Sequence, residues 1–368
     1  MTTKAYIISA KRSIVAPIGG ALAALEVHDL AAPVITDCLK TAHIKSDQVD
    51  ELILSNALYG GGNPARLAAL AAELPEKVAG LSIDRQCVGG LDAILLAANM
   101  VKSGAADIVI AGGVESYSRR PVRHKTFTDG SAPEAYDRPP FTPWADRDPE
   151  MHIAAGDLAS HLSISQADQD TWTIESHAKA LQHADQLFHE VTPVAGLSDT
   201  SDPYARPLTH ALCKRAKPLS GTVTSANTAT AADAAAFCVV VSEEALKNIP
   251  NSKAIEIGPG ATVGADPTLP GLAPVAAIKA IGADKQTFTH IEIMEAYAAQ
   301  AIACTQEAGL DPTKVNQKGG ALARGHPIGA SGTILAVRLY NDLLETGGTG
   351  LVAIAAAGGI GTALQLKS

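Results

Sequence analysis

Cys87 is the leading candidate for a catalytic nucleophile in this sequence. It stands in the segment RQCVGG (residues 85–90), directly before an apolar stretch with helical spacing. A cysteine at a helix start lies near unpaired N–H groups and the positive end of the helix dipole, and both stabilise a thiolate. The two glycines after it allow a flat substrate group to approach the backbone. A cysteine without further context is more often buried and inert, so a nearby base is needed to make Cys87 a nucleophile.

His326 is the candidate base. It lies in the run GHPIGASG (residues 325–332), which also leads into an apolar helical stretch. Residues 89–113 can be laid over residues 329–359, because each segment contains a Gly-rich turn, a helix, a loop, an apolar strand and a Gly-rich exit. The similarity indicates a duplicated unit, with chance likeness between Ala/Gly-rich segments as the alternative. Duplication would place Cys87 and His326 face to face across a pseudo-twofold axis, as an activated sulfur nucleophile requires.

The elements around these residues alternate between strands and helices. Apolar runs predict buried strands at residues 5–9, 51–55, 108–111, 239–241, 255–257, 290–294 and 351–355. Helical spacing predicts helices at residues 29–42, 65–73, 91–103, 166–183, 296–308 and 332–346. This alternation predicts α/β layers with largely buried sheets. Residues 117–220 contain both Trp residues, about half of the Pro residues and most of the His and Arg residues. They are expected to be an irregular insertion that covers a site.

The composition excludes several classes of protein. With 368 residues, 46% hydrophobic and 18% charged, the chain can bury a large core. A net charge of −9 and the lack of a Lys/Arg-rich run argue against nucleic-acid binding. The five cysteines are scattered, so neither a disulfide framework nor a metal site is indicated. No apolar helix reaches the roughly 20 residues of a membrane span, and the N-terminus does not resemble a signal peptide; we expect a cytoplasmic protein.

Several motifs together resemble the thiolase superfamily. They occur in the family's order: NPAR (63–66), the Cys87 segment, GGVES (112–116), GTVTSAN (221–227), GHPIGASG (325–332) and GGIG (358–361). The resemblance covers nearly the whole chain and is weakest in residues 117–220. It implies a duplicated five-layer α/β/α/β/α fold with an inserted loop domain that binds coenzyme A. The halves would comprise residues 1–116 with 221–248, and residues 249–368, around a loop domain of residues 117–220.

The resemblance also implies roles for individual residues. Cys87 would be the acyl-accepting nucleophile and His326 its base, with backbone N–H groups at Cys87 and near Ala357 forming an oxyanion hole. The residues expected to line the pantetheine tunnel are Met151, Ser225, Ala226, Ala296 and Tyr297. The expected ligand is acyl-CoA as a substrate, with no tightly bound cofactor and no metal. The expected partners are a small-molecule acceptor and further copies of the chain, as a dimer or a dimer of dimers.

The sequence departs from the family pattern at residues that serve carbon–carbon chemistry. Met294-Glu-Ala-Tyr297 replaces an Asn-Glu-Ala-Phe segment, and methionine cannot hold the water that stabilises an enolate. Ala355 stands where the family has a second cysteine that moves the α-proton. Gly89, Ala229 and Arg324 also depart from the pattern. These changes favour an acyltransferase with a non-enolate acceptor; the alternatives are a conventional thiolase with rearranged acid/base groups, and a non-catalytic CoA-binding scaffold beside an accessory subunit.

Overall fold

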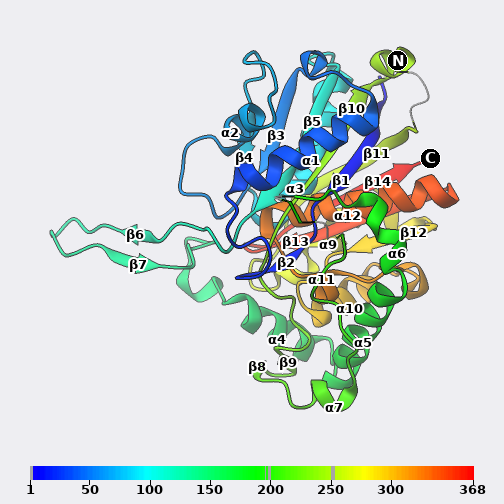
Figure 1. Cartoon of the computed structure of the whole chain (residues 1–368). Coiled ribbons are helices and arrows are strands. Elements are labelled where there is room, and N and C mark those ends of the chain that lie inside the picture. Colours follow the sequence, from blue (N-terminus) through cyan, green and yellow to red (C-terminus); the bar gives the residue numbers. More distant parts are fainter. Residues whose placement is uncertain (1–2, 195, 198–199, 250–252) are drawn as a thin grey trace.

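The computed structural model describes residues 3–194, 196–197, 200–249 and 253–368. Ten strands of this part of the chain form one continuous sheet (Figure 1). In spatial order they are β12 (His290–Ile293), β13 (Thr349–Ala356), β14 (Ile360–Lys367), β11 (Ile255–Gly264), β1 (Ala5–Arg12), β10 (Ala232–Ser242), β5 (Ile108–Glu115), β3 (Glu51–Ser55) and β4 (Leu81–Ile83), with β2 (Ala16–Pro17) beside β10.

The sheet contains the same four-strand unit twice. The order β1-β10-β5-β3 in one half corresponds to β11-β14-β13-β12 in the other. In both units the first two pairings are antiparallel and the third is parallel. The units meet where β1 pairs with β11 through Tyr6 and Ile7. The predicted duplication is therefore confirmed, and it extends well beyond the two segments that indicated it.

Five layers follow from where the cores lie. The central core is built from α3 (Gly89–Ser103), α12 (Ile328–Thr346) and the inner faces of both half-sheets. A second core lies under α1 (Val27–Ala42) and α2 (Pro64–Ala71) on the outer face of the first half. A third lies under α9 (Ala273–Ala280) and α10 (Ala298–Glu307) on the outer face of the second half. These layers confirm the predicted α/β/α/β/α architecture.

The two central helices meet backbone to backbone at glycines. A Cβ added to Gly90 would lie 2.7 Å from the carbonyl oxygen of Gly329, and one added to Gly332 would lie 2.5 Å from the backbone nitrogen of Leu91. Both distances are shorter than any real Cβ contact, so only glycine permits this approach. The approach brings the first turns of α3 and α12, and hence the loops before them, close together.

Most elements lie where the sequence places them, with informative shifts at the helix ends. The helix expected from residue 296 begins at Ala298, because Tyr297 is extended with φ −140° and ψ 144°. The helix expected from residue 332 begins four residues earlier, at Ile328, directly after Pro327. Strand β14 and helix α9 were not among the predicted elements. The remaining short helices are α6 (Ala184–Leu187), α7 (His210–Cys213), α8 (Glu243–Lys247) and α11 (Ala321–Arg324).

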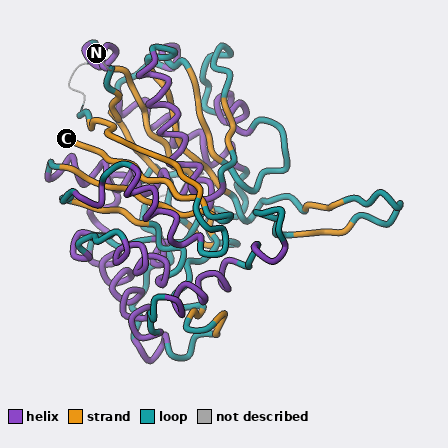
Figure 2. Tube along the Cα trace, turned by 180° about the vertical axis from the view of Figure 1, so that it is seen from behind, coloured by secondary structure: helices purple, strands orange, loops and turns teal. Residues whose placement is uncertain are grey.

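The segment between β5 and β10 lies outside the duplicated units. Its helices α4 (Met151–His161) and α5 (Gln166–Gln182) pack against α10 and cover one side of the second half. The hairpin of β6 (Arg123–Lys125) and β7 (Glu134–Tyr136) projects away from the body (Figures 1 and 2). Strands β8 (Pro218–Ser220) and β9 (Val223–Thr224) form a second small hairpin near its end.

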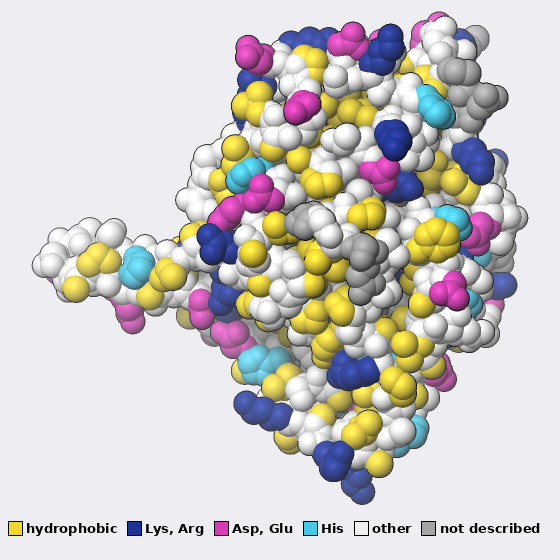
Figure 3. All heavy atoms as spheres, viewed as in Figure 1, with side chains coloured by type: hydrophobic (Ala, Val, Ile, Leu, Met, Phe, Trp, Pro, Cys, Tyr) yellow, Lys and Arg dark blue, Asp and Glu magenta, His cyan; other side chains and the backbone are white. Residues whose placement is uncertain are grey.

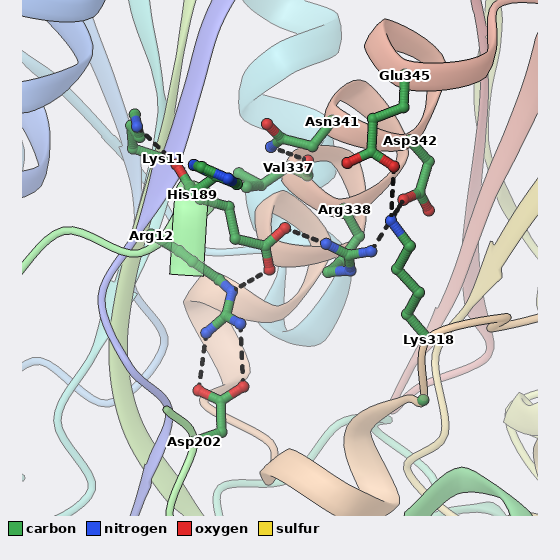
Figure 4. Close-up of polar contacts among 12 residues, drawn as sticks. Lys11, Arg12, His189, Asp202, Lys318, Val337, Arg338, Asn341, Asp342 and Glu345 are labelled. Carbon is green, nitrogen blue, oxygen red and sulfur yellow. Dashed lines mark hydrogen bonds and ion pairs between the residues drawn. The ribbon is translucent and has the colours of Figure 1, made fainter. Parts of the chain in front are cut away.

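A buried ion network ties this segment to both halves (Figure 4). Glu190 accepts from Arg12 Nε of β1 at 2.7 Å and from Arg338 of α12. Arg12 also contacts Asp202 at 2.8 Å, and Arg338 donates to Asp342 at 3.1 Å. Each buried charge is paired, which offsets the large cost of removing it from water. On the face in Figure 3, by contrast, acidic and basic side chains are interspersed.

Candidate active site

Cys87 and His326 lie side by side where the two central helices begin. Cys87 belongs to the 3-10 turn Gln86–Val88 that leads directly into α3. His326 lies between α11 and α12. His326 Nε2 is 3.2 Å from Cys87 Sγ, within hydrogen-bond reach for sulfur. The pairing inferred from the duplicated units is therefore present in the structure, although the two residues are 239 positions apart.

The environment keeps the resting thiol protonated. The pKa of Cys87 is raised to about 12, mainly by burial and to a lesser extent by the carboxylates of Glu115 and Asp84, against a lowering by the backbone N–H of Cys87. This corrects the expectation that the helix start would stabilise a thiolate, because desolvation outweighs the helix-end effect. Cys87 therefore needs a base at the moment it attacks.

His326 is held so that it can be that base. Its backbone N–H donates to Thr230 O at 2.7 Å, and Gly325 before it adopts φ 120°, a conformation that favours glycine. Its Nδ1 lies 2.7 Å from Ser331 Oγ, and that hydroxyl donates its single proton to Pro327 O at 3.0 Å. Ser331 can therefore only accept from the ring, so Nδ1 carries the proton and the lone pair of Nε2 faces Cys87. Burial lowers the pKa of His326 to about 4, which keeps the imidazole neutral.

Two buried carboxylates fix the loops around this pair. Glu115, at the end of β5, accepts from the backbone N–H groups of Ala57 at 3.1 Å and Gly329 at 2.9 Å. It thereby joins the start of α12 to the loop after β3. Glu295 accepts from Leu322 N at 3.1 Å and from Ser176 Oγ at 2.8 Å, and so anchors α11 against α5. His326 is thus positioned from both sides, since one carboxylate holds α11 before it and the other holds α12 after it.

The pair opens into a cavity of about 550 Å³. Its wall contains four of the residues for which the sequence predicted a binding role besides the pair, namely Met151, Ala296, Tyr297 and Ala357. Ser225 and Ala226 lie outside this wall, directly after β9, with Ser225 exposed. Their neighbours Thr228 and Ala229 contribute to the wall instead. The cavity is large enough for a small acyl group together with part of a carrier.

The two departures from the family pattern lie in different surroundings. Ala355 is part of the cavity wall, and its side chain is a single methyl group. Met294 is 1% exposed, belongs to the central core and is not part of the cavity wall. Neither side chain can donate or accept a proton.

Three functional candidates were missed by the sequence reasoning. Ser331 lies in the GHPIGASG motif and Glu115 in the GGVES motif, but only the fold shows which residues they contact. Tyr117 lies in the cavity wall, two residues after the end of β5, and the sequence placed it at the start of the insertion. Its position just beyond the end of a central strand was the available signal, since such positions border the active sites of α/β folds.

The described residues were compared with the requirements of a metal site and of a membrane-spanning helix. They contain no group of three or more His, Cys, Asp or Glu side chains arranged to hold a metal ion. Among the helices described, none combines the length and apolar character needed to cross a membrane.

Comparisons with known proteins agree with this geometry. The family model "Thiolase, N-terminal domain" matches residues 5–244, and "Thiolase, C-terminal domain" matches residues 253–368. YhfS of Bacillus subtilis (strain 168), provisionally named an acetyl-CoA C-acetyltransferase, is 39% identical over 99% of both chains. The crystal structure of the Bacillus anthracis acetyl-CoA acetyltransferase has a TM-score of 0.90 at 30% identity and covers 100% of this chain and 99% of that one. Human mitochondrial 3-ketoacyl-CoA thiolase, solved with CoA, has a TM-score of 0.91 at 27% identity and covers 100% of this chain and 98% of that one. The chain belongs to the thiolase family.

Proposed function

We propose that the protein takes an acyl group from acyl-CoA onto Cys87 and passes it to an acceptor other than an enolate. The observation that carries this proposal is the Cys87–His326 pair at 3.2 Å in a cavity whose wall has Ala355 where the family pattern has a second cysteine. Thiolase relatives solved with CoA support CoA as the carrier. Met151, Ala296 and Tyr297 would line the pantetheine path, with Ser225 and Ala226 further out.

The first half-reaction needs only the pair. His326 Nε2 takes the proton of Cys87 as the sulfur attacks the thioester carbonyl, and backbone N–H groups at Cys87 and Ala357 would hold the oxyanion. Collapse of the tetrahedral intermediate releases the CoA thiolate, which takes the proton from His326 and leaves as free CoA. His326 is then neutral again and Cys87 carries the acyl group, so the same base is available for the second half-reaction.

The direct test is intact mass spectrometry after incubation with acyl-CoA of several chain lengths. Wild type should gain one acyl mass that maps to Cys87, whereas Cys87→Ala should gain none. The matched control is Cys304→Ala, since Cys304 is buried in a core away from the cavity and should leave acylation unchanged. A wild-type protein that stays unmodified with every acyl-CoA would refute the enzyme proposal and favour a CoA-binding scaffold.

A conventional acetyl-CoA C-acetyltransferase is the second candidate, favoured by the names of the relatives. Acetoacetyl-CoA cleavage separates the two. We expect little or no cleavage, because the loss of a general base alone costs about a hundredfold to ten-thousandfold in rate. Robust cleavage by wild type would support the second candidate instead.

We also propose a homo-oligomer, at least a dimer. Strand β4 forms the outer edge of the sheet, and its Leu81 is 44% exposed. An uncovered edge strand with an exposed large apolar residue is normally paired or covered. Light scattering at micromolar concentration should give at least twice the mass of one chain, and a single-chain mass would contradict the proposal.

A further inference from the structure

Two tyrosines in the cavity wall have no assigned role in the first half-reaction. Tyr117 follows β5 of the first half, and Tyr297 precedes α10 of the second. Both line the cavity that contains Cys87, and both are half-buried. The charge that Cys87 would carry as a thiolate acts on the pKa of each, which places both phenol groups within electrostatic reach of the sulfur. Each half of the molecule thus contributes one phenol to the site.

Both phenol oxygens are available to a ligand. Among the described residues, none forms a hydrogen bond with either hydroxyl, and neither oxygen belongs to the polar atoms that are sealed from solvent without a partner. The buried Tyr340 behaves in the ordinary way, since its hydroxyl donates to Lys253 O at 2.9 Å. The hydroxyls of Tyr117 and Tyr297 are instead open to the cavity and have no partner in the described part of the chain, so both can hydrogen-bond a molecule that enters it.

Their acid–base properties suit binding and exclude service as a base. Burial raises the pKa of both tyrosines above the ordinary value of 10, and a thiolate at Cys87 would raise it further. The phenols therefore stay neutral at physiological pH, where each can donate one hydrogen bond and accept another. At position 297 the phenylalanine of the family pattern offers neither. The same segment thus has methionine in place of asparagine at 294 and a phenol in place of a phenyl ring at 297.

We propose that Tyr117 and Tyr297 bind the second substrate, and that this acceptor is a small molecule whose nucleophile is a hydroxyl or an amine. The inference rests on the proposed function. A phenol can hold a hydroxyl by donating to one of its two lone pairs and can hold an amine by accepting from one of its N–H groups, which in each case leaves a lone pair for attack. The remaining O–H or N–H proton can pass to His326 Nε2. A carbon nucleophile has no O–H or N–H group for the phenols to hold, and Ala355 supplies no second acid or base that could move its α-proton.

The second half-reaction balances with the residues present. The acceptor's oxygen or nitrogen attacks the acyl carbonyl on Cys87 while His326 Nε2 takes its proton. The carbon–sulfur bond then breaks, and the leaving Cys87 sulfur takes the proton back from His326. The net reaction converts acyl-CoA and the alcohol or amine into free CoA and an ester or amide, with enzyme and protons restored.

The test separates the two half-reactions. Wild type, Tyr117→Phe, Tyr297→Phe and the control Tyr136→Phe, whose tyrosine lies on the projecting hairpin, are acetylated with acetyl-CoA and freed of CoA. Each is then mixed with ethanolamine, and loss of the acyl mass is followed with a denatured acyl-enzyme as the uncatalysed reference. We expect acylation rates within twofold of each other, and a fall in ethanolamine-dependent discharge of about tenfold in each cavity variant but not in Tyr136→Phe.

Other outcomes overturn the inference in distinguishable ways. Unchanged discharge in both cavity variants would remove the tyrosines from acceptor binding. Equal losses in acylation and discharge would assign them to acyl-CoA binding instead. A wild-type acyl-enzyme that ethanolamine discharges no faster than buffer, or that acetyl-CoA discharges to acetoacetyl-CoA, would exclude the heteroatom acceptor. If wild type forms no adduct at all, the proposed function itself fails, and this inference fails with it.

Discussion

The starts of α3 and α12 occupy matching places in the two duplicated units but present different side chains, a thiol at one and an imidazole at the other. Neither helix has a side-chain cap, so the backbone around each start is held by loops and by the other helix. Before α3, the 3-10 turn with Gln86 at φ 52° presents a thiol. At the start of α12, Pro327 and Ser331 hold an imidazole with its lone pair toward Cys87. Duplication therefore supplies two matching helix starts, and under the proposed function the side chain before each one makes it the nucleophile or the base.

The largest expected effect comes from separating the two helix starts. Gly332→Ala would place a Cβ 2.5 Å from Leu91 N and 2.9 Å from its Cβ, so α3 and α12 must move apart. A displacement of about 1 Å at a reacting pair costs on the order of a hundredfold in rate. We expect acylation of Cys87 to fall by about that factor and stability to fall by about 1–3 kcal/mol.

Single-turnover acylation and thermal unfolding measure the two effects. Gly264→Ala is the matched control, because an added Cβ there meets nothing within 4 Å. If Gly332→Ala acylates at the wild-type rate, close helix contact is not what sets the Cys87–His326 distance.

A smaller loss of acylation rate is expected when only the hydrogen bond that orients His326 is removed. Ser331→Ala removes the hydroxyl that fixes the proton on Nδ1, so the ring can adopt the other tautomer, with a proton on Nε2 facing Cys87. Loss of such a supporting group typically costs about 10–100-fold. We expect a fall of this size in the acylation rate with KM for acyl-CoA little changed.

The control is the serine at the far end of the matching helix. Ser103→Ala removes an exposed hydroxyl that bonds Met100 O at 2.9 Å and should leave acylation unchanged. A normal acylation rate in Ser331→Ala would mean that the geometry of Nε2 is set by backbone contacts alone, such as that of His326 N with Thr230 O.

The sequence predicted the positions of most strands and helices well, because local patterns determine them. Strand and helix periodicity located most elements, and the likeness of residues 89–113 to residues 329–359 predicted the facing of Cys87 and His326. The roles of Glu115 and Ser331 were not predictable in this way, because each depends on which loops meet. Glu115 accepts a hydrogen bond from Gly329, which lies 214 positions away in the sequence, and a local sequence pattern cannot predict a contact between residues so far apart.

The sequence was less reliable on protonation and on the cavity wall. The helix start indicated a lowered pKa for Cys87, whereas burial raises this pKa to about 12, because desolvation depends on the whole fold while the helix start is visible locally. Tyr117 was missed since only the fold brings the residue after β5 beside the segment before α10. The division into residues 1–116 with 221–248, 117–220 and 249–368 stays a prediction. So does the expectation that the pantetheine tunnel is lined by Met151, Ser225, Ala226, Ala296 and Tyr297.

The smallest expected effect is that of pH on the base, and it sharpens the comparison of the two helix starts. Burial lowers the pKa of His326 from the ordinary 6.5 to about 4. The neutral imidazole is the active form, so activity is lost only as pH falls through the lowered pKa. At pH 5 a histidine with a pKa of about 4 is about 90% neutral, whereas one with a pKa of 6.5 is about 3% neutral. We therefore expect the acylation rate at pH 5 to stay within about twofold of that at pH 7.5, instead of falling about thirtyfold.

Rapid-quench acylation across pH 4.5–8 with mass detection measures this profile. Stability must be followed in parallel, because a histidine that is kept neutral in the fold binds a proton more readily in the unfolded chain. Its stabilising contribution is complete above pH 6.5 and declines as pH falls from 6.5 toward 4, so circular dichroism should confirm the fold at each pH. Ser331→Ala provides the internal comparison, since a ring that changes tautomer lowers the rate at every pH by the same factor and leaves the midpoint in place. A wild-type midpoint near 6.5 would mean that water reaches His326 in solution, and that Cys87 faces a base more basic than the buried imidazole.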